Sequence, residues 1–252
     1  MYKIPNYDIK KIYLDNYNDE TRKTILSNLK YYTQLKLFNC SRCDLVELPE
    51  NLPNSLIKLI CSNNRLTRLS NLPNSLIKLI CSNNRLTRLS NLPNSLRHLD
   101  CSKNNLKELP KLPNSLEYLF CENNNLTELP NLPNSLDLLW CYNNKLTELS
   151  DLPNSLIELN CSGNNLTELP DLPKSLTRLC CGCNPLIYQD IDIKTINKIN
   201  LKNKIIKRMK LLNRTLLLEH SAMITMNPKR IERLLDNLEI NFLDGSFDTL
   251  TL

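Results

Sequence analysis

A pattern of twenty residues repeats along most of the chain, and this period limits the possible folds more than any other feature. Residues 51–70 read NLPNSLIKLICSNNRLTRLS, and residues 71–90 are an identical copy. Later blocks keep Leu-Pro near the start and the core Leu-x-x-Leu-x-Cys-x-x-Asn-x-Leu, and they begin at Asn91, Lys111, Asn131, Asp151 and Asp171. A fixed period of this length predicts a solenoid of stacked repeats.

The recurring apolar residues predict one short strand in each repeat. Leu59 and Cys61 are two residues apart, so both point to the same face of a strand. Stacked copies would pair these strands into a parallel sheet with two buried columns, one of Leu59, Leu79 and Leu99 and one of Cys61, Cys81 and Cys101. One repeat alone cannot bury its apolar side, so its neighbours must do so.

The core Leu-x-x-Leu-x-Cys-x-x-Asn-x-Leu resembles the leucine-rich repeat signature, in register over about residues 35–186. Its short unit and Leu-Pro opening resemble the bacterial class found in secreted effector proteins. This resemblance implies a leucine-rich repeat solenoid, α/β by convention, with a parallel β-sheet on the concave side and an extended or polyproline-like convex side. Pro53 and its equivalents agree with an extended convex side, because proline lacks an amide donor and fixes φ. The resemblance also implies that Asn64 and its equivalents bond backbone groups of adjacent turns as an internal ladder.

The extent of the period divides the chain into three segments. Residues 1–34 lack the repeat and are expected to form an N-terminal helical cap, with a helix that starts at Asn18 and carries Ile25, Leu26 and Leu29. Residues 35–187 form the solenoid of 20-residue units. Residues 188–252 are expected to form a C-terminal helical cap or tail, because residues 194–214 are amphipathic and Asn227-Pro228 can start a second helix.

The sequence predicts a protein that stays inside the cell that makes it. No apolar run approaches the roughly 20 residues that cross a bilayer, and the N-terminus is too polar for a secretory signal. The segment LEHSAMITMNPKRIERLLDN resembles C-terminal tails of repeat proteins from giant DNA viruses that infect amoebae. That resemblance implies a viral protein that acts on host factors in the host cytoplasm.

The repeat position of the cysteines predicts reduced core residues. Six of the eleven cysteines, Cys61 to Cys161, share one position, and cysteine serves as a small buried hydrophobe in a reducing compartment. Adjacent strands lie about 4.8 Å apart, so distance alone does not exclude a disulfide. The Cys40-x-x-Cys43 pair and the group Cys180, Cys181 and Cys183 are separated by about 34 Å of stacked turns and cannot share a metal ion. We therefore expect no metal site.

The sequence offers no recognisable catalytic motif. Three glycines cannot make a phosphate-binding glycine-rich loop, and His98 lacks an adjacent nucleophile and carboxylate, so a surface histidine is expected. Some bacterial relatives carry a ubiquitin-ligase domain with a catalytic cysteine after the repeats, but no cysteine follows Cys183. We expect a protein that is not an enzyme, with no catalytic residues and no cofactor.

The variable strand residues predict a binding surface on the concave face. Residues on either side of the buried leucine point away from the core, and an aromatic patch emerges there on two adjacent strands. The predicted partner-binding residues are Tyr118, Phe120, Leu138, Trp140 and Tyr142, with Ile60 and Ile80 extending the apolar strip. Contiguous exposed aromatic residues are typical of binding hot spots, so a non-enzymatic scaffold for protein–protein interaction is expected. The chain's own tail could instead cover this patch.

Two other functions remain open at this point. The run from Lys198 to Arg214 contains seven basic residues and no acid, and it could bind the phosphates of a nucleic acid. No aromatic residues interleave with that run, so a solvated cap face is favoured. A substrate adaptor for a ubiquitin ligase is the other alternative. We expect neither nucleic acid nor a membrane as the main partner.

Overall fold

The computed structural model describes residues 8–89 and 91–186. They lie within one compact unit, Met1–Ile196, while a second unit, Asn197–Leu252, falls outside the described residues. None of the helices among the described residues is long and apolar enough to cross a membrane.

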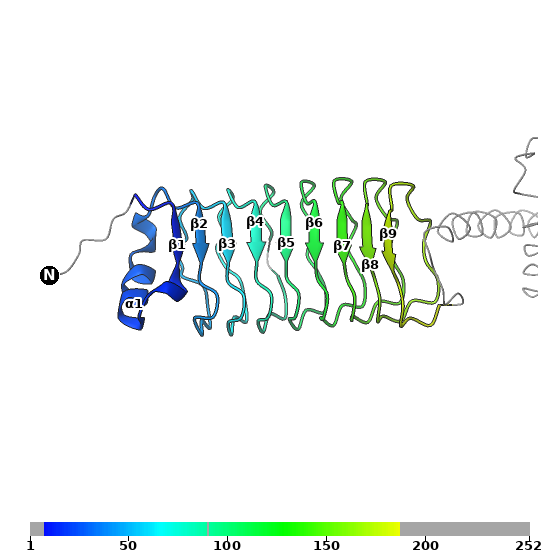
Figure 1. Ribbon diagram of the computed structural model, residues 1–252, viewed down its shortest axis with the longest axis horizontal. Helices are drawn as coiled ribbons and strands as arrows, with labels where there is room; N and C mark the ends of the chain where they lie inside the picture. The colour runs from blue at the N-terminus through cyan, green and yellow to red at the C-terminus, as the bar shows by residue number, and fades with distance from the viewer. Residues whose placement is uncertain (1–7, 90, 187–252) are drawn as a thin grey trace, which may run out of the picture. The chain divides into compact units, whose positions relative to one another are not determined.

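Nine parallel strands form one sheet in strict chain order, which is the solenoid that the repeats predict (Figure 1). The strands are β1 (Lys11–Tyr13), β2 (Leu37–Asn39), β3 (Lys58–Ile60), β4 (Lys78–Ile80), β5 (His98–Asp100), β6 (Tyr118–Phe120), β7 (Leu138–Trp140), β8 (Glu158–Asn160) and β9 (Arg178–Cys180). Register follows the repeat, so Leu59 pairs with Leu79 and Leu79 with Leu99. Each turn therefore places equivalent residues side by side.

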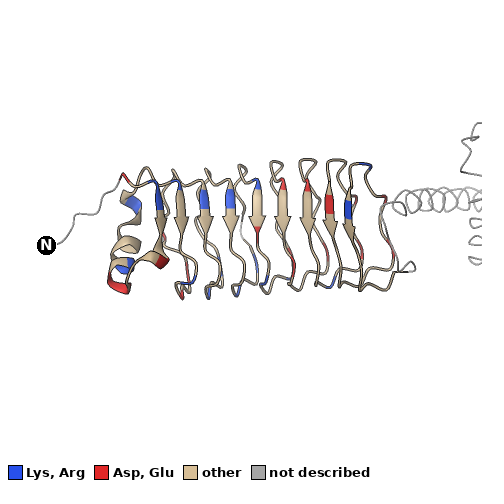
Figure 2. Cartoon of the chain, viewed as in Figure 1, with Lys and Arg blue, Asp and Glu red and all other residues tan. Residues whose placement is uncertain are grey.

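The middle residue of each strand from β1 to β8 is buried, and the first and third residues point to the opposite side. We call that opposite side the sheet face. The core beneath contains two fully buried columns that include Leu59 and Cys61, both with 0% exposure. Charged strand residues consequently lie on the sheet face, where Figure 2 shows basic residues on β3 and β4, an acidic residue on β8 and a basic residue on β9.

The segments between the strands are extended turns without helices over residues 40–89 and 91–177, which agrees with the prolines at these positions. Each Leu-Pro-Asn-Ser-Leu turn closes with a backbone bond such as Leu96 N–H to the Pro93 carbonyl at 3.1 Å. The Ser95 hydroxyl donates to the Leu76 carbonyl at 2.8 Å, so this recurring serine ties each turn to the previous one.

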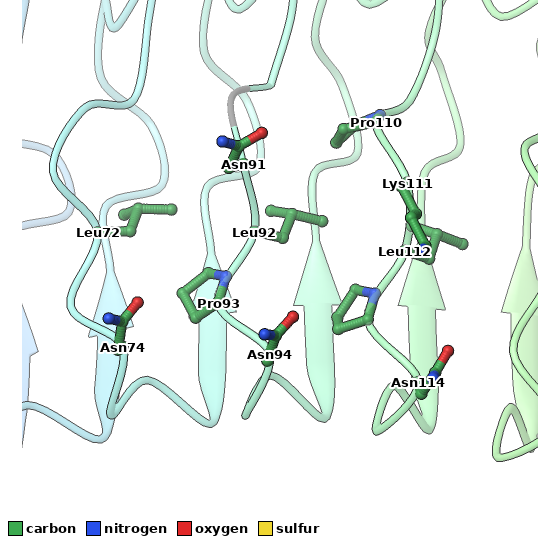
Figure 3. Close-up of a pocket in the computed structure, with 11 residues that line it drawn as sticks. Leu72, Asn74, Asn91, Leu92, Pro93, Asn94, Pro110, Lys111, Leu112 and Asn114 are labelled. Atoms are coloured by element: carbon green, nitrogen blue, oxygen red, sulfur yellow. The ribbon is translucent and has the colours of Figure 1, made fainter.

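These turns line a shallow groove of about 610 Å³ before β4, β5 and β6 (Figure 3). Its lining includes Asn74, Asn94 and Asn114, which are exposed and occupy one repeat position. The same residue types occur in the turns on either side, so the groove is a general property of the repeat and no feature distinguishes it as a site.

The predicted asparagine ladder is confirmed. In a central turn, Asn124 accepts a bond from Leu106 N–H at 3.0 Å and donates to the carbonyls of Cys101 and Cys121, each at 3.1 Å. The residue just before each ladder position has a positive φ, such as 55° at Asn123, a conformation that asparagine tolerates better than most residues. Gly163 supplies this conformation in the turn after β8.

The N-terminal segment contains the predicted helix and one strand that the sequence did not predict. Helix α1 spans Asp19–Ser27, and the Asn18 side chain caps it by accepting from Thr21 N–H at 2.9 Å. Two 3-10 turns, η1 (Leu14–Asn16) and η2 (Leu29–Tyr31), flank this helix. Strand β1 precedes all three elements and pairs with β2, so Ile12 covers Phe38 at the start of the core.

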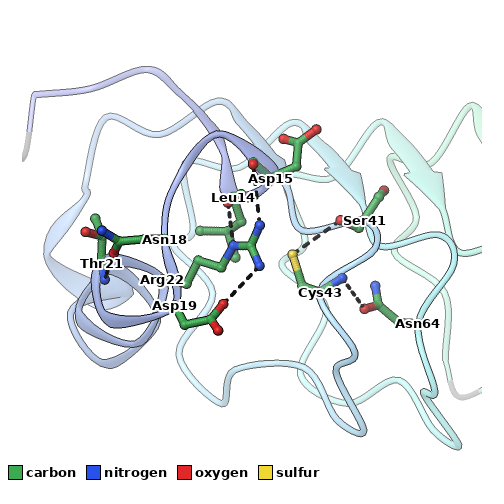
Figure 4. A network of polar contacts seen from close by, with 9 residues as sticks. All are labelled: Leu14, Asp15, Asn18, Asp19, Thr21, Arg22, Ser41, Cys43 and Asn64. Carbon is green, nitrogen blue, oxygen red and sulfur yellow. Dashed lines mark hydrogen bonds and ion pairs between the residues drawn. The ribbon is translucent and has the colours of Figure 1, made fainter.

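Two separate sets of polar contacts lie around α1 and in the first turns of the repeat (Figure 4). Arg22 of α1 donates to the Leu14 carbonyl at 2.8 Å and contacts the Asp19 carboxylate at 3.3 Å. Cys43 takes the position of a ladder asparagine, and its backbone N–H donates to Asn64 Oδ1 at 3.0 Å. The Cys40-x-x-Cys43 pair is thus part of the repeat framework, because Cys40 is fully buried in the core column.

Candidate functional site

The phase of the strands places the predicted binding residues on the sheet face. Cys141 is fully buried while Trp140 is partly exposed, and the same alternation places Cys121 in the core and Phe120 outside it. Phe120 pairs with Trp140 in the strand register, and Tyr118 pairs with Leu138. The five predicted residues of β6 and β7 therefore lie together on one surface.

The rings of this surface are in mutual contact, and we call them the aromatic cluster: His98, Tyr118, Phe120, Trp140 and Tyr142. Phe120 and Trp140 meet edge to face, with centroids 5.1 Å apart and planes at 84°. The ring centroid of Tyr142 lies 6.3 Å from that of Trp140. Edge-to-face packing is a favoured aromatic geometry that adds to the burial of apolar area, so these rings support one another.

His98 belongs to the aromatic cluster, although the sequence predicted an ordinary surface histidine. Its ring lies 5.7 Å from Tyr118 and 5.2 Å from Phe120. Burial against these rings, followed by the positive charge of Lys78, lowers the pKa of His98 to about 4. The imidazole is therefore neutral at physiological pH, and the cluster extends over β5, β6 and β7 without a cationic ring.

Glu158 holds the indole of Trp140 in place, and the sequence analysis did not anticipate this contact. Trp140 Nε1–H donates to Glu158 Oε1 at 2.8 Å. The other carboxylate oxygen of Glu158 pairs with Arg178 at 2.6 Å, so both oxygens of Glu158 are engaged. The only tryptophan of the chain is thereby fixed between a neighbouring ring and a carboxylate. One feature of the sequence points to this contact. Glu158 occupies the position of Leu138 on the next strand, so it lies on the same face as Trp140.

Asp100 separates the two isoleucines from the aromatic cluster. Ile60 pairs with Ile80, Ile80 with Asp100, and Asp100 with Phe120, so all four occupy one column of the sheet face. Asp100 accepts from Ser102 N–H at 3.1 Å and from the Ser102 hydroxyl at 2.7 Å. The apolar strip predicted from Ile60 to Trp140 is thus interrupted by a carboxylate.

Glu122 is a second acidic group beside the cluster. It is only 7% exposed, and its Oε2 atom is buried without a hydrogen-bond partner among the residues that the structure describes. Burial is the main cause that raises the pKa of Glu122, and the nearby Asp100 carboxylate adds to it. The sheet face near β5 and β6 therefore tolerates further negative charge poorly.

Most thiols of the solenoid are buried in its core. All eleven cysteines are free, and the column from Cys61 to Cys161 is fully buried. Burial raises the pKa of Cys141 to about 12, which keeps this thiol protonated and weakly nucleophilic. Cys180 and Cys183 are exposed, and residues 8–89 and 91–186 contain no group of three or more His, Cys, Asp or Glu side chains that could hold a metal ion.

Several sequence predictions fall outside the described residues. They concern the helical cap or tail at 188–252, the basic run at 194–214 and the segment that resembles viral repeat proteins.

The described geometry defines a class of protein: a solenoid whose short strands, buried leucines and asparagine ladder recur once per turn. Solved structures support this assignment. YopM from Yersinia enterocolitica is 44% identical over 64% of this chain and 36% of its own, with a TM-score of 0.61. YopM from Yersinia pestis, a leucine-rich effector protein, is 43% identical over 61% of this chain and 45% of its own, with a TM-score of 0.59.

A Shigella effector leucine-rich repeat domain is 33% identical, covers 66% of this chain and 77% of its own, and has a TM-score of 0.57. The chain therefore belongs to the leucine-rich repeat proteins, with repeats of the bacterial-effector type. It spans less than half of each YopM chain. No protein-family model and no curated protein sequence matches it.

Proposed function

We propose that the chain is a non-enzymatic scaffold that binds a protein partner on its sheet face, the face that the sequence predicts to be concave. Trp140, Phe120, Tyr118 and Tyr142 are the anchors. Leucine-rich repeat scaffolds present an extended surface that one stack of strands provides, and this architecture suits protein binding.

The fixed indole of Trp140 is the observation that carries this proposal. Its contacts with Phe120 and Glu158 hold the ring in one orientation before any partner arrives. Binding hot spots are enriched in tryptophan and tyrosine, and a side chain that is already ordered loses less conformational entropy on binding. A partner would therefore gain the burial of these rings at a small ordering cost.

The chemistry of the face supports binding over catalysis. His98 is neutral and surrounded by rings, and Glu158 is occupied by Trp140 and Arg178. The thiols nearest to the cluster, such as Cys141, are buried beneath the sheet. None of these groups combines an accessible nucleophile with an available base.

The test compares two anchor variants with a matched aromatic control. Trp140→Ala removes the fixed anchor, and Tyr118→Ala removes a ring that is 38% exposed and adds little to the core. Tyr17→Ala is the control, since Tyr17 is similarly exposed at 37% but lies outside the aromatic cluster. Each full-length variant would be used for affinity purification from the native cell, with quantification by mass spectrometry and with circular dichroism and melting as folding checks.

We expect the same proteins to be lost with both anchor variants and retained with Tyr17→Ala. Each anchor should cost at least about 1 to 2 kcal/mol of binding free energy, or about tenfold in affinity. Full retention of the partners by well-folded Trp140→Ala and Tyr118→Ala would refute the proposed face.

The partner is proposed to be a host-cell protein met in the host cytoplasm. The likeness to effector proteins of Yersinia and Shigella supports this assignment. Partners encoded only by the genome that encodes this chain would contradict it.

A further inference from the structure

The first half of the sheet face carries positive charge and no negative charge. The strands β1 to β4 place Lys11, Lys58 and Lys78 on this face and no acidic residue. Figure 2 shows these basic positions along the first strands, whereas acidic residues occur on β5 and β8 and a basic residue returns on β9. A partner that spans several strands therefore meets two different surfaces.

Lys58 and Lys78 are side by side on the sheet face, and the Asp100 carboxylate only partly offsets the charge of Lys78. They pair directly in the register of β3 and β4, and neither makes an ion pair in the part of the chain that the structure describes. Partial burial and the charge of Lys58 lower the pKa of Lys78, the expected consequence of two adjacent ammonium groups.

Four arginines of the solenoid pair with carboxylates of a neighbouring turn. Arg97 pairs with Glu117 at 2.9 Å, and Arg178 pairs with Glu158 at 2.6 Å. Lys58 and Lys78 make no such pair, although each is only partly exposed beside an isoleucine.

The two lysines lie at a peptide-sized distance from Tyr118 and Phe120 of the aromatic cluster, and His98 is the direct neighbour of Lys78. Strand β4 is two strands from β6, which corresponds to about 10 Å at the usual spacing of about 4.8 Å. An extended peptide advances about 3.3 Å per residue, so about three residues bridge this distance. One short segment can therefore contact both surfaces.

We propose that the partner occupies the sheet face with an acidic segment, its carboxylates on Lys58 and Lys78 and an apolar or aromatic side chain on the aromatic cluster. This inference rests on the proposed function and specifies the chemistry of the partner. The spacing predicts an acidic pair followed, about three residues away, by a large apolar residue. The segment crosses Asp100 with an uncharged residue.

The acidic groups on β5 and just after β6 favour a peptide over a nucleic acid. Asp100 lies on the strand between Lys78 and Phe120, and Glu122 lies near Asp100. A nucleic acid carries a phosphate at every nucleotide and would place negative charge beside them, whereas a peptide can confine its carboxylates to one end.

The probe is a phage-displayed library of random 12-residue peptides selected on the full chain. We expect enriched peptides to carry two or more Asp or Glu residues about three positions from Trp, Phe, Tyr or Leu. Synthetic versions should lose at least about tenfold in affinity for Lys58→Glu/Lys78→Glu, because like charges then face each other. The matched control, Lys107→Glu/Lys145→Glu, makes the same charge change at exposed residues away from the strands and should bind as the unmodified chain does.

The outcomes separate this inference from the function on which it rests. Binding that requires Trp140 but survives Lys58→Glu/Lys78→Glu, or enriched peptides without acidic residues, would refute the acidic segment and leave the protein-binding face intact. Binding unaffected by Trp140→Ala, or a library that yields no specific peptide, would count against both. A labelled oligouridine 20-mer that binds in a Trp140-dependent manner and competes with the peptides would replace the peptide by a nucleic acid.

Discussion

Replacing one ladder asparagine tests the interaction that joins successive turns. Asn124 is 8% exposed and makes four bonds to backbone groups. Its oxygen accepts from Leu106 N–H, and its amide donates to the carbonyls of Cys101 at 3.1 Å, Cys121 at 3.1 Å and Glu122 at 3.3 Å. Asn124→Ala removes all four bonds without changing the apolar core.

The expected cost follows from one group left without a partner and two that lose one of their bonds. Leu106 N–H loses its bond to this side chain in a buried region, which costs about 1 to 3 kcal/mol. The carbonyls of Cys101 and Cys121 keep a bond from Asn104 and Asn144, so each loses only about 0.5 to 1.5 kcal/mol. The low ends of these ranges give about 2 kcal/mol. For a chain of this size, that loss corresponds to about 4 to 8 °C in melting temperature.

The assay is urea and thermal unfolding of the full chain followed by circular dichroism. Asn134→Ala is the matched control, because Asn134 is an exposed asparagine one turn away and its loss should change the free energy of unfolding by less than about 0.5 kcal/mol. A ladder variant that unfolds at the same urea concentration as the control would refute the view that the asparagine column joins the turns.

Three further predictions concern the sheet face and one turn. Glu158→Ala releases the indole of Trp140, so acrylamide quenching of the single tryptophan should increase and partner affinity should fall about fivefold; unchanged quenching would contradict the fixed indole. The folded chain keeps His98 neutral with a pKa of about 4 against an ordinary value of 6.5, so stability should fall as the pH decreases from 6.5 towards 4. His98→Asn should make urea midpoints less pH-dependent in that window, and an identical pH profile would contradict the assignment. Gly163→Ala should destabilise by about 1 kcal/mol, because φ is 62° and the added Cβ would lie 2.4 Å from Asn143 Oδ1; unfolding measurements should show a smaller loss from Gly163→Ala in an Asn143→Ala background than in the unmodified chain.

The solenoid could be predicted from sequence because the buried residues that produce it recur with a fixed period. Leu59 and Cys61 recur at a fixed spacing, so one assignment of phase applies to every turn and fixes which side of Trp140 meets the core. The ladder of asparagines could also be predicted, from the resemblance to leucine-rich repeats, and it agrees with the need of buried amides for backbone partners. Tyr118 and Phe120 followed directly, because a residue next to a buried leucine in a strand must point to the opposite face.

The contacts between face residues could not be predicted in the same way. Strand β1 lies outside the repeat and is held by pairing with β2, which leaves no periodic signal in residues 11–13. The bond from Trp140 to Glu158 depends on side-chain rotamers that span neighbouring strands. The neutral state of His98 depends on rings contributed by the next turn. Periodicity places a residue on a face but does not describe its neighbours' conformations.

In each turn, the residues that stabilise the fold differ from the residues that vary on the sheet face, and this separation explains how an almost uniform scaffold can carry a specific surface. Leucine, cysteine and asparagine positions supply burial and backbone bonds in nearly identical form from one turn to the next, so the first and third strand residues can vary with little effect on the fold. The identical blocks at 51–70 and 71–90 keep these positions equal, which is why the two lysines Lys58 and Lys78 lie side by side. The turns that follow diverge at those same positions and contain the aromatic cluster. Specificity therefore arises where the chain departs from its own repeat, and the adjoining duplicated turns add a uniform positive charge beside it.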